Sequence, residues 1–245
     1  MNVKKYLLII ASALLCLCGC SNKNKLDDKT LVIGCSPTPH AKILEFAKPY
    51  FEEKGYKLEI KVLNDYVTPN TLLDSGDLDA NYFQHRPYLN DFNASNGTEL
   101  TWISAVHFEP MGIYSSKHAD LSKASPTIAI PNDVSNGDRA KELLASLSIS
   151  GSLMEVEAQA LPALLSDVDY AVINGNYALS AGITNKCLAT ESTESEIAER
   201  NANVIAVKKS SLSYEWIDVI KSVFKRSEVR DFINSEFGSS VKAVF

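Results

Sequence analysis

The chain has no excess of basic residues. Its 245 residues include 24 lysines and arginines against 30 aspartates and glutamates, which gives a net charge of −6 at pH 7. Proteins that bind nucleic acid need a basic surface to meet the phosphates, so we expect no nucleic-acid partner. The apolar share of 45% and the charged share of 22% are ordinary for a globular protein.

Common catalytic motifs are missing as well. The sequence holds no Gly-x-Ser-x-Gly elbow for a nucleophilic serine, no P-loop, and no Gly-x-Gly-x-x-Gly turn for a dinucleotide. We therefore expect a protein that is not an enzyme and that needs no cofactor.

Cysteine is too scarce for a disulfide framework. Three of the five cysteines lie in the first 20 residues, which leaves Cys35 and Cys187 for the folded part of the chain. Small domains that depend on disulfides carry more cysteines at short spacings. We expect two free, packed thiols, with a single bridge between them as the alternative.

The N-terminus has the pattern of a signal peptide. A basic start with Lys4 and Lys5 precedes an apolar run over residues 7–15, and a polar stretch over residues 21–25 follows closely. The run is too short to span a bilayer core of about 30 Å as a stable helix. A permanent transmembrane anchor is therefore not expected.

The end of this segment, Leu17-Cys18-Gly19-Cys20, resembles the bacterial lipobox, in which the chain is cleaved before the last cysteine and its thiol is acylated. Residues 1–19 would then be a signal peptide, and residues 20–29 a tether lipidated on Cys20. We expect an exported protein that is lipid-anchored to a bacterial cell membrane, on its periplasmic or outer face. A plain secretory signal is the alternative.

Strands and helices alternate in the rest of the chain, which is typical of the α/β class. A buried strand at residues 31–34 precedes a helix with one apolar face, and residues 57–62 alternate as a strand should. A comparable unit follows, with a strand at 128–130, helices at 139–147 and 158–165, and a strand at 167–173.

Two shorter patterns add to this picture. The segments 75–80 and 165–171 echo one another, since each ends a helix and starts an apolar strand. The last two helices, with apolar faces from Trp216 to Phe224 and from Val229 to Phe237, are expected to pack back on the first unit.

Polar residues at strand ends and helix starts are the candidate binding residues, because ligands of open α/β sheets bind outside the carboxyl ends of the strands. Arg139 lies in the expected first turn of a helix that Ser135 or Asn136 can cap. A carboxylate there would meet backbone N–H groups and a guanidinium together. The alternative is an ion pair with Glu142, one turn along.

Asn174 ends the expected strand 167–173, and its amide can both donate and accept hydrogen bonds, which suits the backbone of an amino acid. Its alternative is a turn residue in an Asn-Gly-Asn loop. Tyr66, Phe83 and Tyr88 can form the apolar walls of a pocket, with ordinary core positions as the alternative.

Three further residues offer a different chemistry. His107 and Glu109 are two apart on an expected strand and point to one face, and with His85 they resemble a set of zinc ligands. The spacing is looser than in most metal sites, and the Pro-Cys-x-x-Cys partner of a deaminase motif is absent. A metal-binding lipoprotein is kept as the alternative function.

Several motifs in one order resemble the methionine-binding lipoproteins of the MetQ/NlpA family. The resemblance runs from about residue 31 to the C-terminus. It is carried by Pro39-His40-Ala41, Asp65-Tyr66-Val67, Leu78-Asp79-Ala80-Asn81, Phe83-Gln84-His85, Glu109-Pro110-Met111-Gly112, Pro131-Asn132-Asp133, Ser135-Asn136-Gly137, Arg139-Ala140 and Asn174-Gly175-Asn176-Tyr177.

This resemblance implies a two-lobed periplasmic-binding-protein-like fold of type II. Lobe 1 would span residues 30–113 with 205–245 and lobe 2 residues 114–204, joined by crossover strands. It further implies that L-methionine or a close relative, such as D-methionine or a methionyl dipeptide, binds in the interlobe cleft and is delivered to the permease of an ABC importer. A lipoprotein that serves adhesion or membrane organisation is a third possibility.

The resemblance also assigns roles. Arg139 would bind the ligand carboxylate, Asn174 with Glu109 or Asn136 the amino group, and four side chains would surround the thioether. The full candidate set is Tyr66, Phe83, His85, Tyr88, His107, Glu109, Asn136, Arg139, Asn174 and Asn176. The sequence departs from the family between Leu147 and Glu157, where lobe 2 is shortened near residues 148–154.

Overall fold

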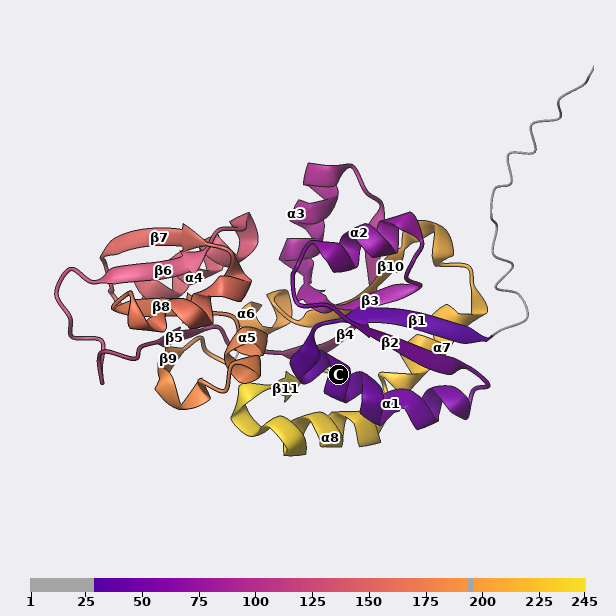
Figure 1. Ribbon diagram of the computed structural model, residues 1–245. Coiled ribbons are helices and arrows are strands. Elements are labelled where there is room, and N and C mark those ends of the chain that lie inside the picture. Colours follow the sequence, from indigo (N-terminus) through magenta and orange to yellow (C-terminus); the bar gives the residue numbers. More distant parts are fainter. Residues whose placement is uncertain (1–28, 194–195) are drawn as a thin grey trace, which may run out of the picture.

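The computed structural model describes residues 29–193 and 196–245, and its secondary structure is built around two separate sheets (Figure 1). Cys20 and the predicted signal peptide lie outside the described residues. We name the six-stranded sheet with its helices lobe 1 and the five-stranded sheet with its helices lobe 2. Within the described ranges, no helix has both the length and the apolar character needed to cross a membrane.

The sheet of lobe 1 has the strand order β11-β4-β10-β3-β1-β2. β1 pairs in parallel with both β2 and β3, whereas β10 comes late in the chain and inserts antiparallel between β3 and β4. The strands are β1 (Thr30–Cys35), β2 (Lys57–Val62), β3 (Ala80–His85), β4 (Leu100–Phe108), β10 (Asn203–Lys208) and β11 (Lys242–Ala243).

Helices cover both faces of this sheet, with α1, α7 and α8 on one side and α2 and α3 on the other (Figure 1). α1 buries Ile43, Leu44, Ala47 and Phe51, the face that the sequence spacing predicts. α7 and α8 join the same core cluster, which confirms that the C-terminal helices pack on lobe 1. The elements are η1 (Pro37–Ala41), α1 (Lys42–Glu52), α2 (Thr68–Ser75), α3 (Arg86–Asn96), η4 (Lys209–Ser211), α7 (Glu215–Val223), α8 (Ser227–Phe237) and η5 (Gly238–Ser240).

Lobe 2 repeats the scheme around the strand order β7-β6-β8-β5-β9, with β6 parallel to β7 and β8. Its strands are β5 (Gly112–Tyr114), β6 (Thr127–Pro131), β7 (Ser152–Val156), β8 (Tyr170–Ile173) and β9 (Cys187–Thr190). Its helical elements are α4 (Val134–Ser146), η2 (Ala158–Ser166), α5 (Gly175–Ser180), η3 (Thr184–Lys186) and α6 (Glu196–Arg200).

The chain passes between the two sheets twice. The first connecting segment, residues 109–111, leads from β4 to β5, and the second, residues 191–202, leads from β9 to β10. The strands that flank them are neighbours in each lobe, because β10 pairs antiparallel with β4 and β9 pairs antiparallel with β5. The two segments meet at the junction of the lobes, where the backbone N–H of Glu191 donates to the carbonyl of Met111 at 2.9 Å.

The two segments that echo one another in the sequence have the same structural role. Asp79 precedes β3, and its carboxylate accepts a hydrogen bond from the backbone N–H of Val32 at 2.8 Å. Asp169 precedes β8, and its carboxylate accepts from the backbone N–H of Thr127 at 2.9 Å. Each aspartate also donates its own N–H to the carbonyl of the same partner residue. The repeat thus closes the start of a parallel strand pair in each lobe.

The segment where the second lobe was expected to be shortened forms a loop and an edge strand that the sequence did not predict. β7 follows Gly151 directly and pairs only with β6 among the described strands. Leu153 and Met154, which point to opposite faces of the strand, are 45% and 41% exposed. This strand buries little of its side chains, so backbone pairing with β6 contributes most of its contact with the lobe.

Both cysteines in the described part of the chain are free thiols, as predicted, and the alternative of a bridge is wrong. Cys35 is buried at the end of β1, where loss of solvent raises the pKa of its thiol to about 12. Cys187 is half-buried on β9, and its thiol donates to the carbonyl of Ala189 at 3.3 Å.

Because the Asp79 carboxylate satisfies a backbone N–H at a parallel strand pair, Asp79→Ala is expected to lower the free energy of unfolding by about 1–2 kcal/mol. Asp169→Ala should act in the same direction in lobe 2. The matched control is Asp77→Ala, because Asp77 is exposed and accepts only from the Ser75 hydroxyl among its described bonds. Urea unfolding checks all three, and an Asp79→Ala variant as stable as the control would contradict the role.

Candidate ligand-binding site

A pocket lined by residues of both lobes lies where the lobes meet. Its wall combines the ends of β3 and β8, the start of α3, the second turn of α4 and the first connecting segment, so it occupies the carboxyl edge of both sheets. The lining residues are Tyr66, Phe83, Gln84, His85, Tyr88, Glu109, Asn136, Arg139, Asn174, Gly175, Asn176 and Asn203.

Nine of the ten residues predicted for the site line this cavity, and His107 lies behind Glu109. Sequence reasoning did not assign a role to Gln84 or Gly175, although both lie inside segments that were singled out. Asn203 was not predicted, because it starts β10, more than 20 residues beyond Asn174-Gly175-Asn176-Tyr177, the last of the candidate binding segments. Its amide oxygen contacts His40 Nε2 at 3.0 Å.

The start of α4 differs from the prediction. Asp133, and not Ser135 or Asn136, is the N-cap, and its carboxylate accepts from the Asn136 backbone N–H at 3.0 Å. Arg139 therefore lies in the second turn of the helix. The amide nitrogen of Asn136 also donates to Asp133, at 2.9 Å. This bond fixes the orientation of the amide group and leaves the amide oxygen of Asn136 as an acceptor in the cavity wall.

That amide oxygen joins the two lobes. It accepts from Asn174 Nδ2 at 2.7 Å within lobe 2 and contacts His85 Nε2 of lobe 1 at 3.1 Å. His85 Nδ1 accepts the backbone N–H of Tyr88 at 3.1 Å, so its proton is on Nε2 and this nitrogen is the donor to Asn136. Burial lowers the pKa of His85 to about 3, and the ring is neutral.

Two atoms of this wall are buried without a hydrogen-bond partner. They are the amide oxygen of Asn174 and the amide nitrogen of Asn176. The Asn176 oxygen is occupied, since it accepts from the Tyr66 hydroxyl at 2.6 Å. A buried polar atom left unpaired costs about 1–3 kcal/mol. The cavity therefore presents one free acceptor and one free donor to a ligand.

Arg139 has a different partner from the one expected. Its Nε and Nη2 donate to the two carboxylate oxygens of Glu191, at 2.8 and 2.5 Å, and both side chains are buried. Nη2 also donates to the backbone carbonyl of Glu109 at 2.9 Å. The predicted alternative of an Arg139–Glu142 pair is wrong, because Glu142 accepts from Arg200 at 2.5 Å on the surface.

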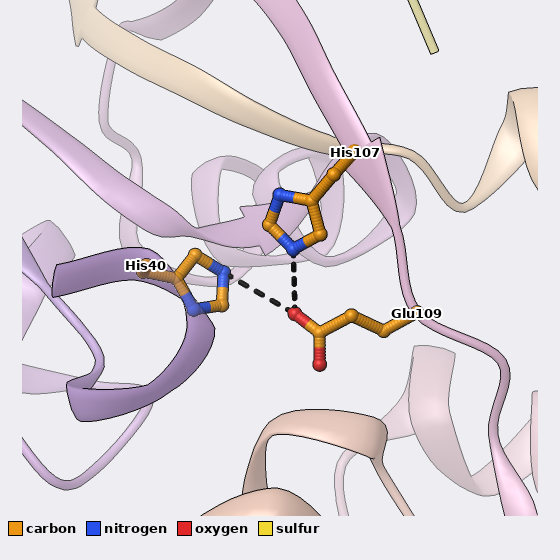
Figure 2. Close-up of side chains that lie close together, drawn as sticks. All are labelled: His40, His107 and Glu109. Atoms are coloured by element: carbon orange, nitrogen blue, oxygen red, sulfur yellow. Dashed lines mark hydrogen bonds and ion pairs between the residues drawn. The ribbon is translucent and has the colours of Figure 1, made fainter. Parts of the chain in front are cut away.

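Glu109 supplies the carboxyl group of the cavity wall, and it is 4% exposed. Figure 2 shows this group facing the rings of His40 and His107. Its Oε1 is hydrogen-bonded to His107 Nε2 at 2.7 Å and lies 3.6 Å from His40 Nε2. The backbone N–H of Asn176 also donates to its carboxylate. Gly175 makes this approach possible, since a Cβ there would lie 2.9 Å from Glu109 Oε2.

Burial dominates the electrostatics of this group. Loss of solvent raises the pKa of Glu109 to about 7, against the opposing effects of His40 and Arg139. It lowers the pKa of His107 to about 3 and of His40 to about 4, so both rings are neutral. The other ionisable side chains that act on Glu109 or feel its charge are Tyr66, Tyr82 on β3 and Tyr114 on β5.

The ligand set proposed for a metal does not assemble. Among the described residues, the group with a metal-like spacing is His40, His107 and Glu109, and it does not include His85. His85 is instead committed to Tyr88 and Asn136. Within the group, His107 Nδ1 is hydrogen-bonded to the Tyr82 hydroxyl and Nε2 to Glu109. This is a network of hydrogen bonds around a carboxylate, and it does not favour the metal-binding alternative.

An aromatic cluster forms the remaining wall. The Tyr66 ring lies 5.8 Å from Phe83, 5.7 Å from Tyr88 and 4.9 Å from Tyr177, measured between ring centroids. Tyr177 belongs to α5 of lobe 2, so Tyr66 contacts aromatic rings of both lobes. Such surfaces suit an apolar or thioether side chain. The sequence placed Tyr177 in a candidate segment without assigning it a role.

Two α/β lobes with a buried polar cavity at their junction define the class of this molecule, a solute-binding protein of the periplasmic-binding-protein type. A family model described as NlpA lipoprotein matches residues 31–150 and 152–245. The chain belongs to the NlpA lipoprotein family. The family and the fold class predicted from the sequence motifs are thereby confirmed, and the chain is a binding protein and not an enzyme.

Individual relatives agree with this assignment. The methionine-binding lipoprotein MetQ of Bacillus subtilis is 31% identical, over 97% of this chain and 96% of the relative. The D-methionine-binding lipoprotein MetQ of Yersinia pestis is 30% identical, over 86% and 92%. A nutrient-binding protein from Burkholderia cenocepacia, solved with bound methionine, has a TM-score of 0.81 and 32% identity, and the match covers 88% of this chain and 100% of that one.

The raised pKa of Glu109 predicts a pH dependence of stability. The folded carboxyl keeps its proton up to about pH 7, whereas the unfolded one loses it near 4.5. Raising the pH between these values therefore favours the unfolded state, by an amount on the order of 3 kcal/mol for the whole interval. Relative to Glu109→Gln, which cannot ionise, the ligand-free protein should lose stability from pH 4.5 to 7.

Urea unfolding of both proteins across this pH range checks the sign. The buried histidines have lowered pKa values, so their own contribution to stability rises with pH. The difference in stability between the two proteins removes this contribution. Equal slopes in the two proteins would contradict a protonated Glu109.

Proposed function

We propose that this protein binds L-methionine, or a close relative of it, in the cavity between its lobes and delivers it to the permease of an ABC importer. The observation that carries the proposal is the polar pattern of the wall. A free acceptor on Asn174 and a free donor on Asn176 line the same cavity as the Glu109 carboxylate and the Arg139 guanidinium. Such a pattern fits the ammonium and carboxylate groups of an amino acid.

The ligand carboxylate is assigned to Arg139 and the Asn176 amide nitrogen. The ligand ammonium is assigned to the Asn174 oxygen and to Glu109. Asn136, the other candidate for the ammonium, is already committed, because its oxygen contacts two donors and its nitrogen donates to Asp133.

The side chain of the ligand is assigned to the aromatic wall. Tyr66, Phe83 and Tyr88 provide ring faces, and neutral His85 adds a further ring beside Tyr88. The relatives named for methionine and D-methionine support a thioether here.

Contacts between the lobes indicate how binding is communicated. Tyr66 donates to Asn176 and His85 donates to Asn136 across the cavity, and Arg86 of α3 donates to the carbonyl of Glu199 on α6. A ligand held by both walls would favour this joined arrangement over a separated one, and the permease would receive one defined shape. We further propose that a lipid on Cys20 holds the protein to the extracytoplasmic side of the membrane, in keeping with its lipoprotein relatives.

Thermal unfolding tests the proposal directly. The protein is unfolded and refolded to remove carried ligand, and then heated with each amino acid, D-methionine and Gly-Met. Methionine or a methionyl relative at 100 times its dissociation constant should add about 2.7 kcal/mol of stability. No response across the panel from a folded protein would refute the proposed function.

Arg139→Lys tests the carboxylate contact while keeping the buried positive charge. Lysine cannot reproduce the forked geometry that serves Glu191 and a ligand together, so methionine should bind at least about tenfold more weakly. Lys141→Ala on the exposed side of the same helix is the matched control. Calorimetric titration compares the two, and unchanged binding by Arg139→Lys would remove Arg139 from the site.

The Glu109 assignment predicts that methionine binding strengthens as the pH rises. An ammonium group favours the ionised carboxylate, so the proton on Glu109 must leave when the ligand binds. The affinity should rise by up to about tenfold per pH unit below pH 7 and level off above it. Titration between pH 5.5 and 8 checks this, with Glu109→Gln expected to bind weakly and without the rise.

A further inference from the structure

The guanidinium of Arg139 has two sides with different partners. The side formed by Nε and Nη2 is occupied by Glu191, and the second proton of Nη2 is used by the Glu109 carbonyl. Nη1 takes no part in these bonds, and Arg139 lines the cavity. Glu191 does not line the cavity, and its carboxylate contacts the lining residue Arg139.

A pocket for a zwitterion has a physical difficulty of its own. It needs a buried cation and a buried anion close together. In the low dielectric of the interior these two groups attract each other strongly, and this attraction competes with the binding of a ligand that must leave water. Here the two are Arg139 and Glu109, and Arg139 already contacts the backbone of Glu109. If their side chains paired, both ligand anchors would be lost at once.

We infer that Glu191 is a positioning residue that keeps the cation and the anion of the pocket apart. By holding Nε and Nη2 it prevents Arg139 from pairing with the Glu109 carboxylate. Nη1 is then left for the ligand carboxylate and Glu109 for the ligand ammonium. This inference rests on the proposed function, since it concerns the same site.

The position of Glu191 is itself fixed. Its Oε2 accepts from the backbone N–H of Met111 at 2.8 Å, and its own N–H donates to the Met111 carbonyl at 2.9 Å. Glu191 begins the second connecting segment and Met111 ends the first. The carboxylate that holds Arg139 is therefore attached to both passages between the lobes.

Glu109 is held on its own side by separate bonds. His107 and the backbone N–H of Asn176 bind its carboxylate. The partners of the Glu109 carboxylate thus differ from those of the Arg139 guanidinium, and the ligand is the group that would connect the two side-chain groups.

The test compares Glu191→Gln with Glu142→Gln by methionine titration between pH 5.5 and 8. Glu142→Gln is the control because it also removes a carboxylate that pairs with an arginine. Glu142 pairs with Arg200, and it lies on the exposed side of α4. In Glu191→Gln, Arg139 should pair with Glu109, so methionine should bind at least about tenfold more weakly at pH 8. The rise of affinity with pH should also flatten, because the paired Glu109 is ionised before the ligand arrives.

The pH profile separates this role from a purely structural one. Weaker methionine binding whose affinity still rises with pH as in the parent would overturn the inference. Binding as strong as that of the parent or of Glu142→Gln would overturn it as well. If Glu191→Gln does not fold, Glu191→Asp replaces it. Its carboxylate is one methylene shorter and cannot hold both Nε and Nη2 from the same backbone position, so weaker binding is again expected and parent-like binding overturns the inference. A parent protein that binds no methionine would refute the proposed function itself, and this inference with it.

Discussion

A guanidinium that is only 5% exposed must find its counter-charge inside the protein, and Arg139 finds it in Glu191. Removing one partner of such a buried pair is far more costly than removing a surface ion pair. The contact therefore constrains everything around it: the turn of α4 that carries Arg139, the two connecting segments that hold Glu191, and the cavity wall that Arg139 completes. The cavity has this form because Glu191, which does not line it, neutralises the charge of Arg139, which does.

The rest of the site follows the same logic with neutral groups. His40, His85 and His107 are all buried and all uncharged, and each makes hydrogen bonds that fix its orientation. Among the residues that line the cavity in the described part of the chain, Glu109 is the one carboxylate. A site with this composition favours a ligand that brings a positive charge to one end and a negative charge to the other.

Much of this was accessible from the sequence, and for identifiable reasons. The apolar face of α1 and the alternation of strands and helices follow from side-chain period, and polar residues at strand ends gather because parallel strands share an edge. The partner of Arg139 was not accessible, because Glu191 is 52 residues away and comes from a segment with no local motif. His40 and Asn203 meet across 163 residues for the same reason. The cap of α4 was misplaced by two or three residues because Asp133, Ser135 and Asn136 are all residues that favour this position.

The paired passage of the chain between the lobes has a mechanical consequence. The two connecting segments are flanked by hydrogen-bonded strand neighbours in lobe 1 and in lobe 2, and Met111 and Glu191 bind each other between them. A single linker would let one lobe swivel, twist and slide against the other. Two linkers that are hydrogen-bonded to each other at Met111 and Glu191 restrict sliding more than one linker would, so rotation of one lobe relative to the other is the motion that they favour. A partner that recognises this protein by its shape would then distinguish its states by the angle between the two lobes.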